Sequence, residues 1–133
     1  MTTTTNNTNK MNNKTIFLNI SNHPLSTWTE PQKAAAGCEI VDISFPLVPP
    51  MASREEVQVM ADEIASQVAD LRTQGTEIAG AHIMGDMTLT FALVVRLKAM
   101  GIKCVESTTL RKVIDQPDGG KTSYFNFVQF REY

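Results

Sequence analysis

The chain has 133 residues, of which 42% are hydrophobic and 20% charged, and its formal net charge is −2. This length fits one domain, and the slightly acidic balance argues against binding to long nucleic acid. No apolar run approaches the roughly 20 residues of a membrane span, and the N-terminus lacks the apolar core of a signal peptide. We therefore expect a cytoplasmic protein that does not associate with membranes.

The first 13 residues differ in composition from the rest of the chain. Thr and Asn occupy ten of these positions, which leaves too little apolar surface for a packed structure. We predict a disordered tail over residues 1–13 and one domain over residues 14–133.

The first half of this domain alternates strands and helices. Residues 14–20 form a near-continuous apolar run, which is typical of a strand covered on both faces. A polar loop then leads to a short helix over residues 29–36, which Gly37 ends. The pattern predicts a second strand over residues 39–45.

The second half begins with the clearest helix. Ser53 and Glu56 match a capping box, apolar residues follow at three- and four-residue steps, and Gly75 ends the segment. A third strand is expected over residues 78–84, followed by a helix over residues 87–100.

The C-terminal part predicts a hairpin. A fourth strand begins at residue 102 and extends toward residue 114, residues 115–120 have turn composition, and residues 123–130 form the fifth strand. Three phenylalanines of the fifth strand are interpreted as packing residues rather than as a nucleic-acid surface. They are Phe125, Phe127 and Phe130.

The order of these elements predicts a single Rossmann-like α/β domain with three layers. Its five-stranded sheet is mostly parallel, with helices on both faces, an antiparallel C-terminal edge hairpin and the strand order 2-1-3-4-5. In such sheets ligands bind beyond the carboxyl ends of the strands, near the point where strand order reverses. The loops at residues 21–28 and 85–90 leave the two strands at that point.

The first loop contains His23, which can transfer a proton near neutral pH or be an ordinary loop residue. Trp28 offers a stacking face for a base or covers the apolar core. The candidate binding residues of this loop are Ser21, Asn22, Ser26 and Trp28. By contrast, His82 lies within the third strand and is interpreted as a satisfied core or edge residue.

The second loop places a glycine between a strand and a helix. Free N–H groups and the helix dipole can receive a phosphate there, although the same residues are also ordinary N-cap residues. The candidates are Gly85, Asp86, Met87, Thr88 and Thr90. Neither of the common glycine-rich nucleotide motifs is present in the sequence.

The fourth strand carries three hydroxyls and a guanidinium near the same edge. Ser107, Thr108 and Thr109 are candidate binding residues, and Arg111 either neutralises a phosphate or is a surface charge. The basic bias of residues 96–121 either suits a small anionic ligand or marks one of two solvated faces of opposite charge. Cys38 and Cys104 are far apart without ligand-type neighbours, so we expect reduced thiols, with Cys104 in the core, no metal and no cofactor.

The helix over residues 87–100 is apolar almost all round. It has more apolar surface than one face of a sheet covers. The simplest cover is the same helix of a second copy, which predicts a homodimer with two-fold symmetry.

Three segments carry a family resemblance: residues 18–25, residues 84–93, and the tail from Cys104 through Ser107-Thr-Thr-Leu-Arg111 to Tyr133. They resemble the small Rossmann-like CRISPR-associated ring nucleases of type III systems, over most of residues 15–133. The resemblance implies a cyclic oligoadenylate substrate, most often the tetramer, and metal-independent attack of a ribose 2′-hydroxyl on the adjacent phosphorus. The product would carry a 2′,3′-cyclic phosphate.

Under this resemblance His23 is the expected acid or base. Arg111 and the N–H groups after Gly85 hold phosphate oxygens, while Asn22, Ser26 and the hydroxyls of residues 107–109 orient ribose. Two other functions remain open: a non-catalytic module that binds a cyclic nucleotide, and an unrelated small protein that acts on another phosphorylated metabolite.

Overall fold

The structure is a computed structural model that describes residues 14–133, so the tail predicted over residues 1–13 lies outside the described residues. The elements in chain order are β1 (Thr15–Ser21), the 3-10 helix η1 (Leu25–Thr27), α2 (Glu30–Ala36), β2 (Glu39–Asp42), α3 (Arg54–Thr73), β3 (Glu77–Met84), α4 (Met87–Ala99), β4 (Cys104–Asp115) and β5 (Lys121–Glu132). No helix among these is long and apolar enough to cross a membrane.

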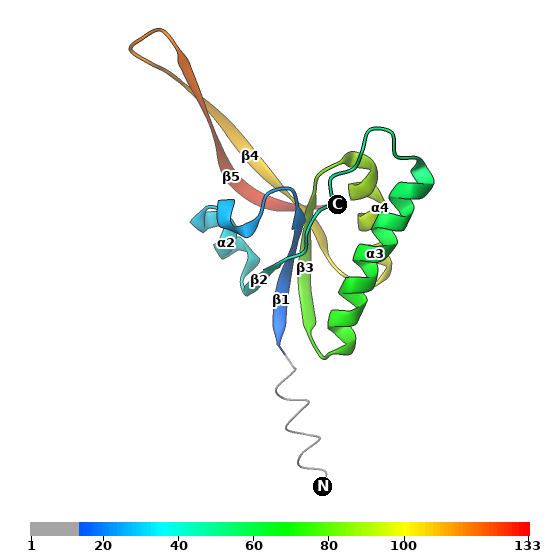
Figure 1. Cartoon of the computed structure of the whole chain (residues 1–133). Helices are drawn as coiled ribbons and strands as arrows, with labels where there is room; N and C mark the ends of the chain where they lie inside the picture. The colour runs from blue at the N-terminus through cyan, green and yellow to red at the C-terminus, as the bar shows by residue number, and fades with distance from the viewer. Residues whose placement is uncertain (1–13) are drawn as a thin grey trace.

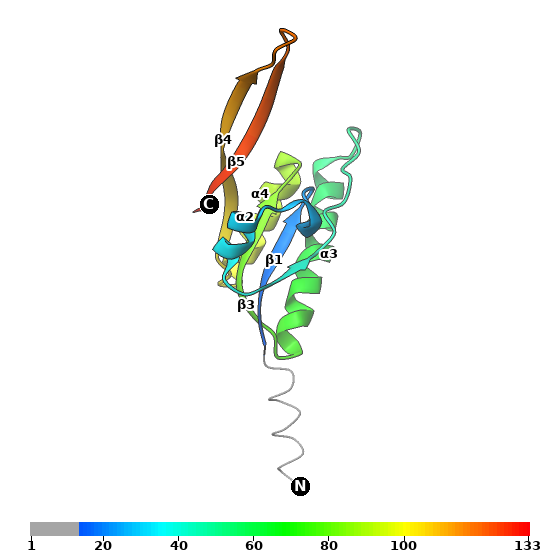
Figure 2. The same cartoon turned by 90° about the vertical axis from the view of Figure 1, so that its left-hand side faces the viewer.

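The five strands form one sheet in the order β2-β1-β3-β4-β5. All neighbours are parallel except β4 and β5, which are antiparallel. Helix α2 lies on one face of the sheet, and α3 and α4 pack together on the other (Figures 1 and 2). The predicted Rossmann-like fold and its strand order are confirmed.

Alternation along β1 divides the core between the two faces. Leu18 and Ile20 belong to the larger apolar cluster beneath α3 and α4, whereas Phe17 belongs to a smaller cluster with Trp28 and Val105 on the α2 face. Both faces of the strand are thereby buried, which explains why its sequence reads as a continuous apolar run. The side chains of Asn19 and Ser21 share the α2 face with Phe17.

The ends of the elements follow the local signals in the sequence. Ser53 and Glu56 form both bonds of the capping box, each 3.1 Å long. Gly37 ends α2 in the left-handed region at φ 77°. Strand β2 is shorter than the predicted 39–45. Beyond Asp42 only the N–H of Ile43 continues the backbone pairing, by donating to Asn19 O, and the prolines that follow end the strand.

Strands β4 and β5 extend beyond the sheet as a two-stranded arm, shown in yellow to red in Figure 1. Strand β3 pairs with β4 only at residues 104 and 105, whereas β4 and β5 stay paired from Val105 to Asp115. Isolated two-stranded ribbons are marginally stable in water. The arm adds to this by leaving large apolar side chains in contact with solvent, among them Leu110 and Phe125, each 64% exposed.

Candidate functional site

A hollow of about 500 Å³ opens on the α2 face, at the carboxyl ends of β1 and β3. We call it the histidine pocket. It is lined by His23, Thr27, Trp28, Thr29, Gln32, His82, Met84, Ser107, Thr109, Phe125 and Phe127. Its position agrees with the site predicted from the strand order. Of the predicted site residues, the structure brings together His23, Trp28, Ser107 and Thr109.

A row of polar side chains crosses the sheet beneath this pocket, and its two central members are buried. Asn19 and His82 are each 1% exposed and stand opposite each other on β1 and β3. His82 Nδ1 lies 2.9 Å from Asn19 Oδ1, and His82 Nε2 lies 2.8 Å from Ser107 Oγ. The row therefore links a buried imidazole to a hydroxyl that lines the pocket.

The partners of Asn19 determine the tautomer of this imidazole. The Asn19 amide nitrogen donates to the Asp42 carboxylate at 2.9 Å and to His23 O at 2.8 Å, so its oxygen faces His82. A carbonyl oxygen only accepts, hence Nδ1 of His82 carries the proton and Nε2 is an acceptor. The proton of Ser107 then points to Nε2.

Helix α2 supplies the last bond of the row. Gln32 Nε2 lies 3.0 Å from Ser107 Oγ. Because the serine proton is directed at His82, the Gln32 amide donates to the serine oxygen. Ser107 is thus held from two sides by hydrogen bonds whose directions are both defined.

Burial lowers the pKa of His82 to about 4, and the nearby His23 adds to this effect. The imidazole packs edge-on against Trp28 and lies beside Phe130, with ring centroids 5.1 and 5.6 Å apart. It is consequently neutral throughout the physiological range. The prediction that His82 is a buried residue with satisfied hydrogen bonds is confirmed. In addition, its Nε2 accepts a hydrogen bond from Ser107, which lines the pocket.

The backbone of the first loop is fixed at a single carbonyl. His23 O accepts from Asn19 Nδ2, from Ser21 Oγ at 3.1 Å and from Trp28 Nε1 at 3.0 Å. These bonds hold the loop against β1, while the His23 side chain is exposed at the pocket. The exposed His23 side chain is thereby carried on a backbone turn that these three hydrogen bonds hold in place.

The chain can be placed in a family at this point. The model of the uncharacterized protein MJ1673 family matches residues 15–131. The chain belongs to this family. No curated protein matches it. The family description names no activity, so the function of this MJ1673 family member has to be argued from its site.

Several predicted roles in the first loop need correction. Trp28 is only 5% exposed, so it covers the core and offers no open stacking face. The accessible ring at the pocket is Phe125, which was expected to be a packing residue. Ser21 is buried and bonded within the loop, and neither Asn22 nor Ser26 lines the pocket.

The exposure of Phe125 follows from a bulge in β5. Thr108 pairs with Gln129, but Thr109 pairs with Phe127, so Val128 is an extra residue. The bulge changes the alternation and turns Phe125, Phe127 and Phe130 toward the α2 face. Phe130 stacks on Phe17 with centroids 5.3 Å apart, as expected of a packing residue.

The predicted phosphate loop after β3 does not belong to the histidine pocket. Asp86 caps α4 by accepting a hydrogen bond from Leu89 N at 3.0 Å. N-capping is the alternative to phosphate binding that the sequence left open for this residue. A Cβ atom at Gly85 would lie 2.4 Å from the Phe45 ring, so the glycine permits a close contact there. Met87 is 86% exposed, Thr88 is also exposed, and none of residues 85–90 lines the pocket.

Three of these residues, Gly85, Met87 and Thr90, border a second, apolar hollow instead. This α4 hollow has a volume of about 310 Å³ and is lined by Met84, Gly85, Met87, Thr90, Phe91, Val94 and Tyr133. The Oγ1 atom of Thr90 is buried without a hydrogen-bond partner in residues 14–133. Met84 lines both this hollow and the histidine pocket.

The last corrections concern β4. Thr108 points to the opposite face from Ser107 and donates to Gln129 O. Arg111 shares the face of Thr109 but lies outside the pocket lining and donates to Ser123 Oγ at 3.1 Å. The structure does not bring Arg111 together with His23.

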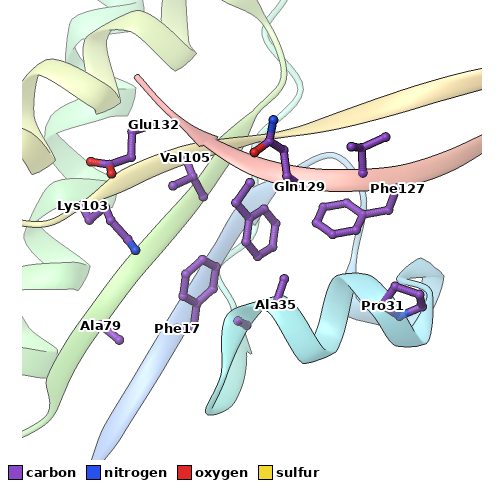
Figure 3. Close-up of a pocket in the computed structure, with 12 residues that line it drawn as sticks. Phe17, Pro31, Ala35, Ala79, Lys103, Val105, Phe127, Gln129 and Glu132 are labelled. Atoms are coloured by element: carbon purple, nitrogen blue, oxygen red, sulfur yellow. The ribbon is translucent and has the colours of Figure 1, made fainter.

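A third hollow lies between α2 and the base of β5, with a volume of about 510 Å³ (Figure 3). Figure 3 shows Phe17 and Ala35 within it, and the Lys103 side chain reaches in from the segment before β4. This α2 hollow is lined mainly by apolar side chains and lies away from the carboxyl ends of β1 and β3. We therefore take the histidine pocket as the functional site.

Residues 14–133 form no candidate metal centre in the two hollows or in the histidine pocket. In the part of the chain that the structure describes, no three His, Cys, Asp or Glu side chains group closely enough to hold a metal ion. Cys104 is buried, as expected, and burial raises the pKa of its thiol to about 11. Cys38 is half-buried.

The residues that sequence reasoning missed are those of this polar row, namely Asn19, Gln32, Asp42 and His82, of which Asn19 and His82 are buried. One signal was present for Asn19, because a polar side chain interrupts the apolar run of β1. A buried amide needs hydrogen-bond partners, and these are supplied here by the neighbouring strands.

Proposed function

We propose that the protein is a metal-independent ring nuclease that cleaves a cyclic oligoadenylate, with the tetramer as the first candidate, and so ends type III CRISPR signalling. The observation that carries this proposal is the histidine pocket. It combines two histidines, pocket-facing hydroxyls and an accessible aromatic ring at the carboxyl edge of the sheet. The segments that resemble ring nucleases include the loop and the strand that supply His23 and Ser107.

The pocket is suited to nucleotide chemistry in which the nucleophile belongs to the substrate. The ribose 2′-hydroxyl attacks phosphorus in line with the 5′-oxygen, so the protein needs to align the two and transfer a proton. His23 is exposed at the pocket on a rigid loop and is positioned for such a transfer. Phe125 supports an adenine by stacking.

Charge around the pocket favours an anionic ligand. None of its lining residues is acidic. The arm next to it carries the exposed bases Arg111, Lys112 and Lys121, of which Lys121 is paired with Asp115 at 2.8 Å. Arg111 is bonded only to the neutral Ser123 among residues 14–133, so its charge remains available to a ligand that extends along the arm.

We further propose that the ring is bound by a homodimer. Helix α4 exposes an apolar stripe at one-turn spacing, formed by Met87, Phe91 and Val95, which are 86%, 72% and 51% exposed. A pocket of about 500 Å³ suits a ligand of drug size, whereas a ring of four nucleotides is larger. Met84 lines both the α4 hollow and the histidine pocket, so a copy seated on α4 would cover one of the residues that line the site.

The test is incubation of the full chain with cyclic tetra-adenylate in the presence of EDTA, followed by chromatography and mass spectrometry. Linear products that end in a 2′,3′-cyclic phosphate support the proposal. The His23→Ala variant should cleave about 10²–10⁴-fold more slowly if its imidazole transfers a proton. Ser26→Ala, which changes a residue of the same loop outside the pocket, is the matched control.

A non-catalytic binding module is the second candidate, because the pocket alone accounts for binding. It predicts that the ring raises the melting temperature and is recovered intact after prolonged incubation with stoichiometric protein. An intact ring without any thermal shift would contradict both candidates and favour another phosphorylated ligand.

A further inference from the structure

We infer that Ser107 is the catalytic residue that takes the proton of the attacking ribose hydroxyl, with His82 and Asn19 as the positioning residues behind it. The inference rests on the proposed ring cleavage and deepens it. In this assignment Ser107 takes the proton of the ribose hydroxyl and passes its own proton to His82. His23 remains the acid that protonates the leaving oxygen.

The first step of the argument is the orientation of the serine hydroxyl. Its proton points at His82 Nε2, 2.8 Å away, and one of its lone pairs accepts from Gln32 at 3.0 Å. A hydroxyl has two lone pairs, so one remains free. Because Ser107 lines the pocket, a ligand hydroxyl can donate to that lone pair.

The second step is the state of the imidazole. The Asn19 oxygen accepts from Nδ1, and the Asn19 amide is itself bonded to the Asp42 carboxylate. Nε2 of His82 is therefore a hydrogen-bond acceptor. The imidazole ring cannot turn without breaking its hydrogen bonds to Asn19 and Ser107. The titratable groups that bear on this ring are His23, from the loop, and Asp42, through Asn19.

The third step is the effect of the ligand. An unliganded imidazole with a pKa near 4 is a weak proton acceptor at neutral pH. A phosphate in the pocket brings negative charge close to the ring, and a nearby opposite charge favours the protonated form. Binding of an anionic ester thus strengthens Nε2 as an acceptor only when a substrate is present.

The resulting step balances in atoms and charge. The 2′-oxygen loses its proton to Ser107 Oγ, the original serine proton moves to His82 Nε2, and the 2′-oxygen forms its bond to phosphorus. The bond from phosphorus to the 5′-oxygen breaks, and that oxygen receives a proton from His23. The imidazolium of His82 then returns its proton through Ser107 to solvent, and His23 is reprotonated from solvent.

The experiment is single-turnover cleavage of cyclic tetra-adenylate by the full chain in EDTA. We compare wild type with Ser107→Ala, with Ser107→Thr, which keeps the hydroxyl, and with Thr108→Ala, which removes the adjacent hydroxyl on the opposite face. Ser107→Ala should be about 10²–10³-fold slower, with the dissociation constant of the ring changed less than about threefold. Ser107→Thr should recover most of the rate, and Thr108→Ala should equal wild type.

A second measurement separates loss of the relay from damage to the fold. The ¹⁵N shifts of His82 should show an unprotonated Nε2 in wild type and in Ser107→Ala, since Asn19 sets the tautomer. A normal rate for Ser107→Ala overturns the relay and leaves ring cleavage intact. A wild-type protein that leaves the ring uncut overturns the proposed function, and the relay falls with it. A protonated Nε2 in wild type overturns the relay even if the ring is cleaved.

Discussion

The imidazole of His82 and the hydroxyl of Ser107 are joined across β3 and β4 by a 2.8 Å contact between Nε2 and Oγ. Strand register produces this contact. Asn19 stands opposite both Asp42 and His82, and Val105, which stands opposite His82, is two residues before Ser107 on the same face of β4. Four strands thus each contribute one polar side chain to a single row, and the last of them reaches the pocket.

The buried histidine makes folding stability depend on pH. Its pKa is about 4 in the folded protein and about 6.5 in the unfolded chain, so the unfolded state binds more protons between these values. This contribution is fully present above pH 6.5 and is lost as the pH falls through 4. Between pH 7.5 and pH 5, we expect the free energy of unfolding in urea to fall by about 2 kcal/mol.

The matched comparison uses the two histidines. His82→Gln should remove most of this slope, whereas His23→Ala should keep most of it, because burial is the larger cause of the lowered pKa. Equal slopes for wild type and His82→Gln would contradict a neutral, buried His82. Comparing slopes rather than absolute values keeps the test valid for a less stable variant.

The contact between Gly85 and Phe45 gives a second prediction. A methyl group at position 85 would lie 2.4 Å from the Phe45 ring, so Gly85→Ala should destabilise the fold by about 1–3 kcal/mol in urea unfolding. Adding Phe45→Leu should relieve part of the clash, and the double variant should cost less than the sum of the two. Gly120→Ala is the control, because its new methyl group meets only the flexible Asp118 side chain.

Sequence predicts the fold well because its signals are local. The apolar run of β1, the capping box at Ser53 and the glycine after α2 each act within a few residues, and together they imply the element order. That order in turn fixes where a ligand site belongs in the sheet. In this way the sequence places His23, Trp28, Ser107 and Thr109 at the site, and all four line the histidine pocket.

The rest of the site depends on contacts between distant segments. The His82 row needs the register of four strands, and the pocket-facing Phe125 needs the bulge at Val128; neither feature has a local signature. The loop after β3 could not be placed from the sequence, because an N-cap and a phosphate site use the same residue types. The structure shows that Asp86 caps α4 and that the loop lies outside the histidine pocket.

The two cysteines should differ in reactivity. Cys104 is 3% exposed and its thiol pKa is raised to about 11 by burial, so little thiolate forms at pH 8. Cys38 is half-buried. We expect a disulfide reagent such as DTNB to modify Cys38 first in the native protein and to reach Cys104 only on unfolding. The Cys38→Ser variant should show no fast phase, and a fast phase in it would contradict a buried Cys104.

The apolar stripe of α4 predicts the oligomeric state. Wild type should show twice the 14.7 kDa chain mass by light scattering, and Phe91→Glu should give the mass of a single chain, because a charge at a residue that is 72% exposed disrupts only an interface. Val59→Glu, on α3 at a site 55% exposed, is the control and should stay dimeric. A dimer that survives Phe91→Glu but dissociates with Leu110→Glu would place the interface on the arm instead. A monomeric wild type would mean that a single pocket serves the ligand.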